Sequence, residues 1–253
     1  MSKHDNESSS AALRALNLLE QVARADGPVA PADLMAATGL PKPTVHRILG
    51  VIEQAGMLVR EPDGRRYLPG PRLAALALDV LSNTGIRGPR HAILQGLVAE
   101  LGETCNLTML DGGEVVYLDR VEAAWPLRLH FQRGSRVPAH CSASGKLLLS
   151  LLPARERKRL LDAMPMERFT DKTVTDREAF DAALKRIRRE RVSTDDEEYL
   201  EGTVCVAVPV DDGDRRVPAA LAVHAPSSRM GLSQALAHLP ALRRAAAQLA
   251  ATF

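Results

Sequence analysis

The segment Leu40–Leu58, LPKPTVHRILGVIEQAGML, carries apolar residues at helical spacing. Positions i, i+3, i+4 and i+7 of a helix share one face, and here they are occupied by Val45, Ile48, Leu49 and Ile52. The opposite face carries no acid before Glu53, and its polar side chains gather at the N-terminal end. Because a solvated face is typically rich in both Glu and Lys, this pattern predicts a helix with a binding surface.

Two shorter helices are predicted upstream. The first covers about residues 11–24, and its apolar side is formed by Leu13, Leu16 and Leu19. The second covers about residues 31–38 and ends at Gly39, since glycine suits the position after a helix. A tight turn then leads into the helix of the opening segment, whose start is fixed by Pro41 and Pro43. Short helices joined by a turn that contains glycine predict a helix-turn-helix.

A hairpin is predicted directly after this motif. Short strands at 58–60 and 66–68 flank Asp63-Gly64, which is a strong turn signal. From Leu40 to Arg72 there are six basic residues and three acidic ones. A helix-turn-helix followed by a hairpin with arginines at its tip is a winged helix, and the small basic excess lies where a DNA duplex would touch it.

The pattern changes downstream of this segment. An apolar helix at 73–82 is expected to connect two domains and to pack against another copy of itself. Beyond Arg87, strand-like runs alternate with helices. The strands are expected at 104–110, 114–121, 127–131, 203–210 and 217–224, and the helices at 90–101, 144–151, 153–164, from Thr175 with a capping box to Glu178, and from Pro240 to about 250.

These elements predict an α+β chain. We expect a disordered lead at 1–10, a winged helix-turn-helix domain at 11–72, a linker helix at 73–86, and a domain with a mainly antiparallel sheet at 87–253. Net charge is only +2, and 45% of residues are hydrophobic, as in an ordinary globular protein. Three widely spaced cysteines indicate neither a disulfide framework nor a zinc knuckle. With no signal peptide and no membrane span, the pattern predicts a cytoplasmic protein without a membrane partner.

The whole chain resembles one known family. The stretch GLPKPTVHRILGVIEQAGMLVREPDGRRYLPGPRL is similar to the winged helix of the IclR family of bacterial transcriptional regulators. The segments HCSASGKLLLSLLP, STDDEEYLEGTVCVAVPV and APSSRM resemble three segments of its effector-binding domain, which has a GAF/PAS-like fold. Their order and spacing over residues 11–250 make the match specific. Pro43 departs from the Ser or Thr of many members, and Ala222 and His224 depart from residues that are often small and hydroxylic.

The predicted DNA contacts lie on the third helix and the wing. The N-terminal residues of a recognition helix face base edges in the major groove, and here these are Thr44, His46 and Arg47. Lys42, Arg65 and Arg66 are expected to contact phosphates, which gives affinity without sequence choice. The alternative interpretations are a winged helix used only for protein contact and a face that is simply solvated.

The resemblance also implies an effector pocket. It places the start of a helix against the pocket, where free N–H groups and the helix dipole suit a carboxylate. The residues that it implies are Leu129, Val137, Ser142, Ala143, Ser144, Gly145, Asp195, Cys205, Ala222 and His224. Cys205 is as readily a small buried core residue as a ligand contact, and His224 is open to both interpretations.

Other chemistries fit the sequence poorly. A P-loop requires Gly six residues before the Lys of Gly145-Lys146 and Ser or Thr after it, but His140 and Leu147 stand there. A Ser-x-x-Lys nucleophile fails because Ala143 occupies the Ser position. The cysteines and histidines lie in separate segments, so neither a metal site nor a cofactor is expected.

The sequence therefore predicts a regulator without catalytic residues. We expect a homodimer or tetramer that binds a pseudo-palindromic double-stranded DNA operator, with a small carboxylic acid as effector. The competing hypothesis is a metabolic enzyme or signalling protein that uses the winged helix to dimerise, with any turnover dependent on Cys141 or His140.

Overall fold

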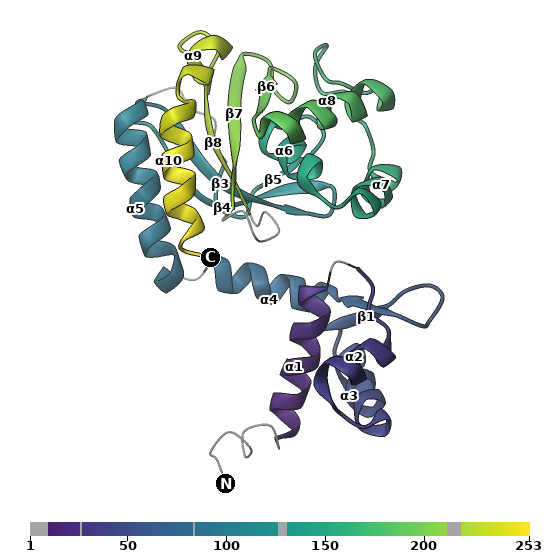
Figure 1. The fold of residues 1–253 in the computed structure, drawn as a ribbon. Helices are drawn as coiled ribbons and strands as arrows, with labels where there is room; N and C mark the ends of the chain where they lie inside the picture. The colour runs from purple at the N-terminus through teal and green to yellow at the C-terminus, as the bar shows by residue number, and fades with distance from the viewer. Residues whose placement is uncertain (1–9, 26, 83, 126–130, 212–218) are drawn as a thin grey trace. The chain divides into compact units, whose positions relative to one another are not determined.

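The structure is a computed structural model that describes residues 10–25, 27–82, 84–125, 131–211 and 219–253 (Figure 1). The chain divides into two compact units, Met1–Val80 and Leu81–Phe253. Each unit has its own cluster of buried apolar side chains. Within the described residues, no helix combines the length and apolarity that a membrane crossing requires.

The smaller unit contains the predicted helix-turn-helix and hairpin. Its elements are α1 (Ala11–Arg24), α2 (Pro31–Thr38), α3 (Lys42–Gln54), β1 (Leu58–Arg60) and β2 (Tyr67–Pro69). The Ser10 hydroxyl caps α1 by accepting a hydrogen bond from the Ala12 N–H at 3.3 Å. Gly39 ends α2 in the left-handed region, with φ +67°. Pro41 is the N-cap of α3, so the chain enters the next helix without losing a helical hydrogen bond.

The core of the smaller unit confirms the inward face of α3. All four of its predicted apolar positions are buried against α1, α2 and the hairpin, namely Val45, Ile48, Leu49 and Ile52. The predicted inner side of α1 is wrong in part. Leu19 is buried together with Leu18 and Val22, but Leu13 and Leu16 are 44% and 54% exposed. The core contacts only the C-terminal half of α1, so its first turns remain uncovered.

The hairpin is fastened to the rest of the smaller unit through the backbone. Tyr67 exchanges two hydrogen bonds with Val29, at 2.8 and 2.9 Å, and its side chain is 1% exposed. After β2 the chain returns close to the end of α3, where the Gly70 N–H donates to the Met57 carbonyl oxygen at 2.8 Å. A Cβ at Gly70 would lie 2.4 Å from the Gly56 carbonyl oxygen. This approach of two backbones requires glycine.

Two helices follow the hairpin. The expected connector is α4 (Pro71–Ser82), and Leu73 packs against the core of the smaller unit. The next helix, α5 (Thr84–Leu101), begins six residues before the predicted start at Arg90 and contains Pro89. Pro89 lies beyond the first turn of α5, so its missing N–H costs the helix one backbone hydrogen bond, yet the helix continues through it.

A six-stranded antiparallel sheet organises the described part of the larger unit. Its strands are β3 (Thr104–Asp111), β4 (Glu114–Val121), β5 (Arg136–Pro138), β6 (Ser193–Asp196), β7 (Thr203–Val210) and β8 (Ala219–Pro226). They are ordered β5-β4-β3-β8-β7-β6. The two long hairpins, β3–β4 and β7–β8, meet at the centre where β3 pairs with β8. The α+β class with a mainly antiparallel sheet is confirmed.

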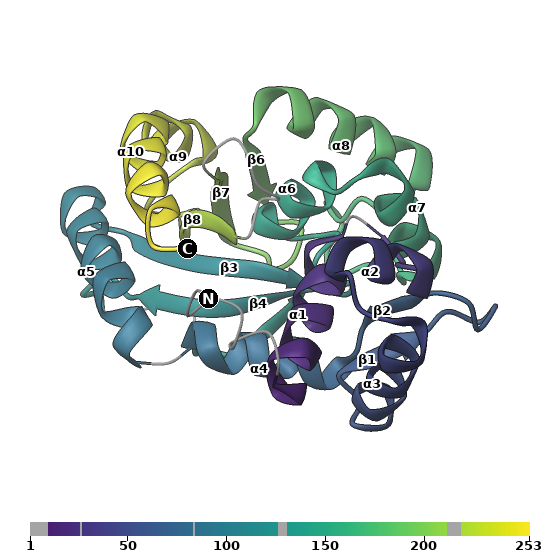
Figure 2. The same cartoon turned by 60° about the horizontal axis from the view of Figure 1, so that its bottom comes forward.

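Helices cover both faces of this sheet. On one face, α5 packs beside α10 (Leu239–Ala250), with α9 (Leu232–Ala237) at the end of β7. On the other face lies α6 (Ala143–Leu151), and Figure 2 shows it between the sheet and α8 (Arg177–Glu190). A further helix, α7 (Ala154–Ala163), follows α6 in the chain. Because α6 is covered on both sides, most of its residues are buried, polar ones included.

Several short elements differ from the prediction. The strands β5 and β6 and the helix α9 were not predicted. The expected strand at 127–131 lies outside the described residues except for Phe131, which is not in a strand. The cap of α8 is Asp176, whose carboxylate accepts from the Ala179 N–H at 2.8 Å, rather than Thr175. The predicted lead at 1–10 also lies outside the described residues, apart from Ser10.

The single tryptophan lies in the larger unit, between α5 and the end of β8. The Trp125 indole N–H donates to the Gly102 carbonyl oxygen at 2.9 Å. The Arg229 guanidinium lies 4.8 Å from the ring centroid and pairs with Glu103. The ring is 45% exposed.

Candidate functional site

The outer face of α3 presents cations at its N-terminal end. Lys42, His46 and Arg47 are exposed, and Thr44 is half-buried. Among the residues that the structure describes, neither Lys42 nor Arg47 forms an ion pair. Because Val45 and Ile48 are buried directly behind this ridge, its position on the unit is fixed by packing.

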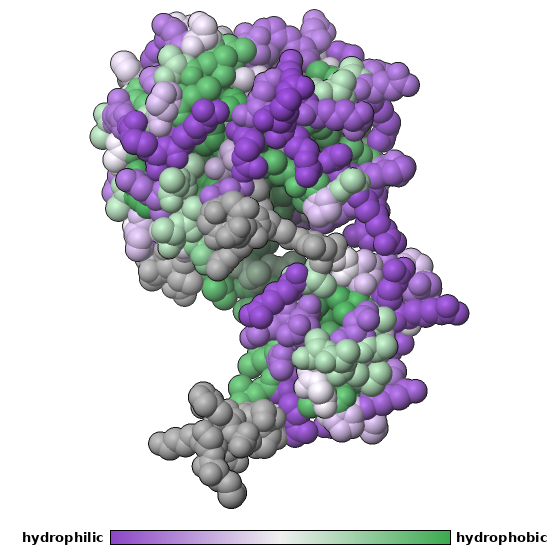
Figure 3. Space-filling view, viewed as in Figure 1, coloured by the Kyte–Doolittle hydropathy of each residue, from purple (hydrophilic) through white to green (hydrophobic). Residues whose placement is uncertain are grey.

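The two wing arginines have different environments. The Arg66 guanidinium lies 2.6 Å from a Glu61 carboxylate oxygen and 3.6 Å from Asp63, so it closes the hairpin turn. Arg65 is exposed, and within the described ranges only its backbone N–H is engaged, by Asp63 at 2.9 Å. The tip of the β1–β2 hairpin, which projects at the right of the smaller unit in Figures 1 and 3, is hydrophilic. A free cation at this tip is available to a phosphate, whereas Arg66 already has acidic partners.

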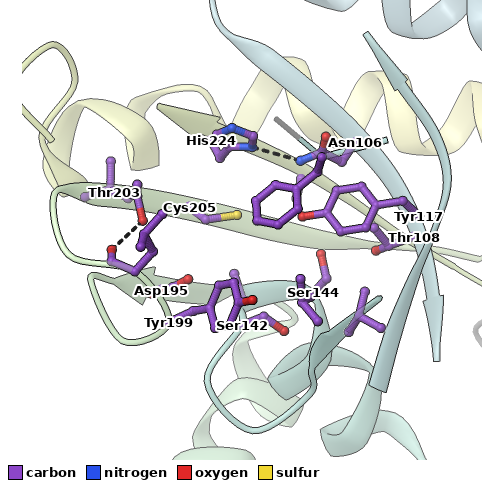
Figure 4. Close-up of a pocket in the computed structure, with 17 residues that line it drawn as sticks. Asn106, Thr108, Tyr117, Ser142, Ser144, Asp195, Tyr199, Thr203, Cys205 and His224 are labelled. Atoms are coloured by element: carbon purple, nitrogen blue, oxygen red, sulfur yellow. Dashed lines mark hydrogen bonds between the residues drawn. The ribbon is translucent and has the colours of Figure 1, made fainter. Parts of the chain in front are cut away.

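The larger unit holds a cavity of about 40 Å³ between the sheet and the start of α6 (Figure 4). It brings together residues from β3, β4, β7 and β8 with the segment before α6 and the β6–β7 loop. Of the residues implied by the family resemblance, those that line it are Val137, Ser142, Ala143, Ser144, Asp195, Cys205, Ala222 and His224. Gly145 is adjacent but does not line it, and Leu129 lies outside the described residues.

The N-terminus of α6 forms one end of the cavity. The Ser142 hydroxyl donates to the Pro138 carbonyl oxygen at 3.0 Å and accepts from the Gly145 N–H at 3.2 Å. The first N–H groups of a helix have no partner within it, and among the described residues those of Ala143 and Ser144 have none elsewhere. Gly145 permits this geometry, because a Cβ there would lie 2.2 Å from the Ala139 carbonyl oxygen. The segment 142–145 was predicted from the sequence, but the close approach of Gly145 to the Ala139 carbonyl was not.

A buried carboxyl lies beside that helix start. Asp195 is 6% exposed and accepts from the Glu198 N–H at 2.8 Å. Burial raises the pKa of the Asp195 carboxyl to about 7, against a smaller opposing effect of the Lys146 ammonium. Lys146 is itself buried and pairs with Glu198, whose second oxygen has no hydrogen-bond partner among the described residues. Near neutral pH, Asp195 is therefore both a donor and an acceptor.

The opposite end of the cavity is formed by Asn106 and His224. The Asn106 amide donates to His224 Nδ1 at 3.0 Å (Figure 4). Burial and the nearby Arg120 lower the pKa of His224 to about 3, so the ring is neutral. The Arg120 guanidinium, with its side chain 4% exposed, donates to Asn106 Oδ1 at 2.8 Å. His224 was predicted from the sequence, whereas Asn106 and Arg120 were missed.

Aromatic rings form the wall between the two ends. The chain has three Tyr, four Phe and one Trp, and four of these rings lie together. Tyr117 stacks on Phe131 at 5.5 Å between centroids, and Tyr199 lies 6.4 Å from Phe131 and 5.3 Å from Phe169. Because the chain has so few aromatic residues, their positions could have pointed to this cluster. They are far apart in the sequence, however, so the sequence does not show that they meet.

Among the residues that the structure describes, the thiols and histidines do not form a reactive centre. Burial raises the pKa of the Cys141 thiol to about 12, which keeps it protonated. His140 donates through Nε2 to the Glu167 carbonyl oxygen at 2.8 Å. No group of three or more His, Cys, Asp or Glu suited to a metal ion occurs in the described part of the chain.

Comparison with known proteins identifies the family. The family model described as the IclR helix-turn-helix domain matches residues 11–62, and that described as the bacterial transcriptional regulator IclR C-terminal domain matches residues 78–251. The protein named "Probable transcriptional regulator SauR" of Cupriavidus necator is 48% identical, over 98% of each chain.

Solved structures agree with this assignment. The IclR structure of Thermotoga maritima has a TM-score of 0.63 and 26% identity, and the match covers 94% of this chain and 96% of that one. An IclR homolog from Microbacterium hydrocarbonoxydans, complexed with 4-hydroxybenzoate, has a TM-score of 0.59 and 26% identity over 96% and 98%. The matched relatives are transcriptional regulators, and this chain is likewise not an enzyme. With both of its parts matched in order, the chain belongs to the IclR family of bacterial transcriptional regulators.

Proposed function

We propose that this regulator reads a double-stranded operator with the N-terminal end of α3 and the tip of the wing. The observation that carries the proposal is the exposed, unpaired cations Lys42 and Arg47, within the described residues, on a helix anchored from behind. Thr44, His46 and Arg47 would face base edges, and Lys42 and Arg65 would contact phosphates. Arg66 is proposed to shape the wing turn, because Glu61 and Asp63 already neutralise it.

The operator is proposed to be pseudo-palindromic and bound by a dimer or tetramer. Leu76 and Val80 on α4 are each 47% exposed, and the start of α1 also exposes leucines. Apolar side chains uncovered in this way favour contact with a second copy. Half-sites would then lie about 34–36 Å apart, one turn of the duplex.

The cavity in the larger unit is proposed as the site of a small organic acid. The free N–H groups at the start of α6 favour an anion there. The 4-hydroxybenzoate complex of the Microbacterium homolog supports a carboxylic acid as the class of ligand. Effector and operator sites of this kind are coupled by typically about 1–3 kcal/mol, and α4 is the segment through which the chain would transmit it.

Arg47→Ala is expected to reduce operator affinity by roughly 5- to 150-fold, because a bidentate contact to guanine is worth about 1–3 kcal/mol. Binding to competitor DNA should fall much less. The measurement is a gel shift on duplexes from the region upstream of its own gene, with unrelated DNA alongside.

Arg65→Ala is the matched control. Loss of a phosphate contact should weaken both kinds of DNA alike and reduce the slope of log affinity against log salt by about 1. If Arg47→Ala also weakens both DNAs equally, Arg47 contacts a phosphate and does not read a base.

Asp195→Asn is expected to change how stability depends on pH. The folded-state pKa of about 7 exceeds the ordinary value of 3.8, so the folded protein binds a proton that the unfolded chain has released. The wild-type free energy of unfolding therefore falls as pH rises from about 4 to 7. Asparagine does not titrate, so between pH 5 and pH 8 the difference in stability should shift toward the variant by a few kcal/mol.

Thermal unfolding of both proteins at pH 5 and pH 8 measures this shift. The charged and titratable groups around Asp195 are Lys146, Glu198, Tyr199, Cys141, Cys205 and Tyr117, and all remain in the variant. Asp196→Asn, at an exposed neighbouring carboxylate, is the control and should follow the wild type. A Tm difference for Asp195→Asn that is constant with pH would contradict the prediction.

A further inference from the structure

An irregularity in β4 decides which charge faces the effector cavity. Thr108 of β3 pairs with Tyr117, but Leu107, the next residue along, pairs with Asp119. Leu118 and Asp119 thus stand opposite a single residue, which is a β-bulge. Residues on a regular strand alternate between the two faces of a sheet, and the extra residue shifts that alternation by one.

Because of this shift, the cavity side of β4 carries the Arg120 guanidinium and not the Asp119 carboxylate. Tyr117 lines the cavity, so regular alternation would place Asp119 on the same face. With the bulge, Asp119 faces α5, where it accepts from Arg87 at 3.0 Å and contacts His91 at 2.9 Å. Arg120 instead pairs with Asn106, which lines the cavity.

The Arg120 guanidinium lies directly behind the cavity wall. Besides its bond to Asn106, its two terminal nitrogens lie 3.4 and 3.5 Å from the ring nitrogens of His224. Glu122 is an acidic partner of Arg120, at 3.4 Å, and its side chain is 27% exposed. Since His224 is neutral and the Glu122 carboxylate reaches solvent, this end of the cavity retains a positive field.

The cavity therefore has two ends that attract anions. Figure 4 shows Asn106 and His224 on one side and Ser142 and Ser144 on the other, with Tyr117 and Cys205 between them. The second end offers the free N–H groups of α6. Among the described residues that line the cavity, the wall between the ends carries no charge, and the titrating Asp195 carboxyl lies beside the α6 end (Figure 4).

The small volume of the cavity limits the bulk of a ligand that could reach both ends. A cavity of about 150 Å³ holds benzene, and this one measures about 40 Å³. An effector enters only as side chains such as Phe131 and Tyr199 move, and a short chain requires the least movement. An aromatic ring would require a larger movement of these side chains.

We propose that the effector is a short aliphatic dicarboxylate. One carboxylate would take the N–H groups at the start of α6, and the other would be received by Asn106 and His224. Arg120 does not line the cavity, so we assign it as a positioning residue that selects for the second negative charge through these two side chains. This inference rests on the proposed effector site.

The test compares diacids with monoacids of the same length on the full chain, by calorimetry and by operator gel shift. Malonate and succinate are expected to bind at least tenfold more tightly than propionate and butyrate, and more tightly than benzoate. Arg120→Met should weaken diacid binding by about 10- to 100-fold, the usual contribution of a charged hydrogen bond, and monoacid binding by less than about threefold. Arg120→Lys should restore part of the preference.

Each other outcome overturns the inference in a distinct way. Equal loss of diacid and monoacid binding in Arg120→Met assigns Arg120 a purely structural role. Wild-type protein that binds monoacids or benzoate as well as diacids has an organic-acid site without the second anion subsite, and the proposed function stands. If no acid of the panel binds or alters operator binding, the effector proposal fails together with this inference. The wild-type comparison requires no variant to fold.

Discussion

Gly145→Ala is expected to abolish the effector response while leaving operator binding in place. The added Cβ would lie 2.2 Å from the Ala139 carbonyl oxygen and 2.4 Å from its Cα. Both are backbone atoms, so no rotamer change relieves the overlap. Helix α6 is enclosed between the sheet and α8, and it has little room to move away. The segment before α6 must shift, and with it the N–H groups that end the cavity.

Overpacking of this kind costs about 3 kcal/mol or more. For a unit of this size that lowers Tm by roughly 6–12 °C. Scanning calorimetry of the full chain measures the shift, and calorimetric titration with an organic acid measures the lost site. Gly96→Ala is the matched control, because Gly96 lies inside α5 and a Cβ there would meet nothing within 4 Å, so that variant should be as stable as the wild type or slightly more so. A Gly145→Ala protein that melts within about 2 °C of the wild type would refute this expectation.

Gly70→Ala is expected to produce the reverse result, with DNA binding lost and the effector site retained. A Cβ at Gly70 would lie 2.4 Å from the Gly56 carbonyl oxygen and 2.9 Å from the Leu58 nitrogen. These atoms belong to the turn that joins α3 to β1. The contact therefore separates the wing from the recognition helix that it flanks.

The smaller unit has a smaller core, so a loss of about 3 kcal/mol removes much of its total stability. We expect operator affinity to fall by at least 100-fold in the gel shift, with organic-acid binding unchanged. Gly27→Ala is the control in the same unit, since a Cβ there meets nothing within 4 Å and the residue has no positive φ. Operator binding by Gly70→Ala within about threefold of the wild type would show that the backbones separate without consequence.

The smaller unit was predictable because its signals are local. The apolar spacing of α3, the turn at Gly39 and the Asp63-Gly64 hairpin each depend on residues close together in the sequence. Periodicity alone did not distinguish a leucine that faces the core from one that faces outward, and so Leu13 and Leu16 were misplaced. Their environment depends on how far the core extends along α1, which is a property of the packed unit.

The proposed effector cavity was predictable only in part. The residues implied by the family resemblance lie in segments with recognisable order, and most of them line the cavity, while their role in binding stays a prediction. Arg120 was not predictable, because the bulge at Leu118 reverses the face that alternation assigns to it. The short strands β5 and β6 are edge strands of three and four residues, too short to show a pattern.

The wing shows the same limit at the level of single residues. Arg65 and Arg66 are identical and adjacent in the sequence, so composition gives both the same role. Only the fold places Glu61 and Asp63 around one guanidinium and leaves the other exposed.

The position of Trp125 gives the two units different optical signatures. Because it is the chain's single tryptophan, intrinsic indole emission comes from the larger unit alone. Melting of the smaller unit will leave that emission unchanged while far-ultraviolet dichroism falls. A fluorescence trace that precedes or follows the dichroism trace during heating would therefore reveal, without any label, which half of the regulator unfolds first.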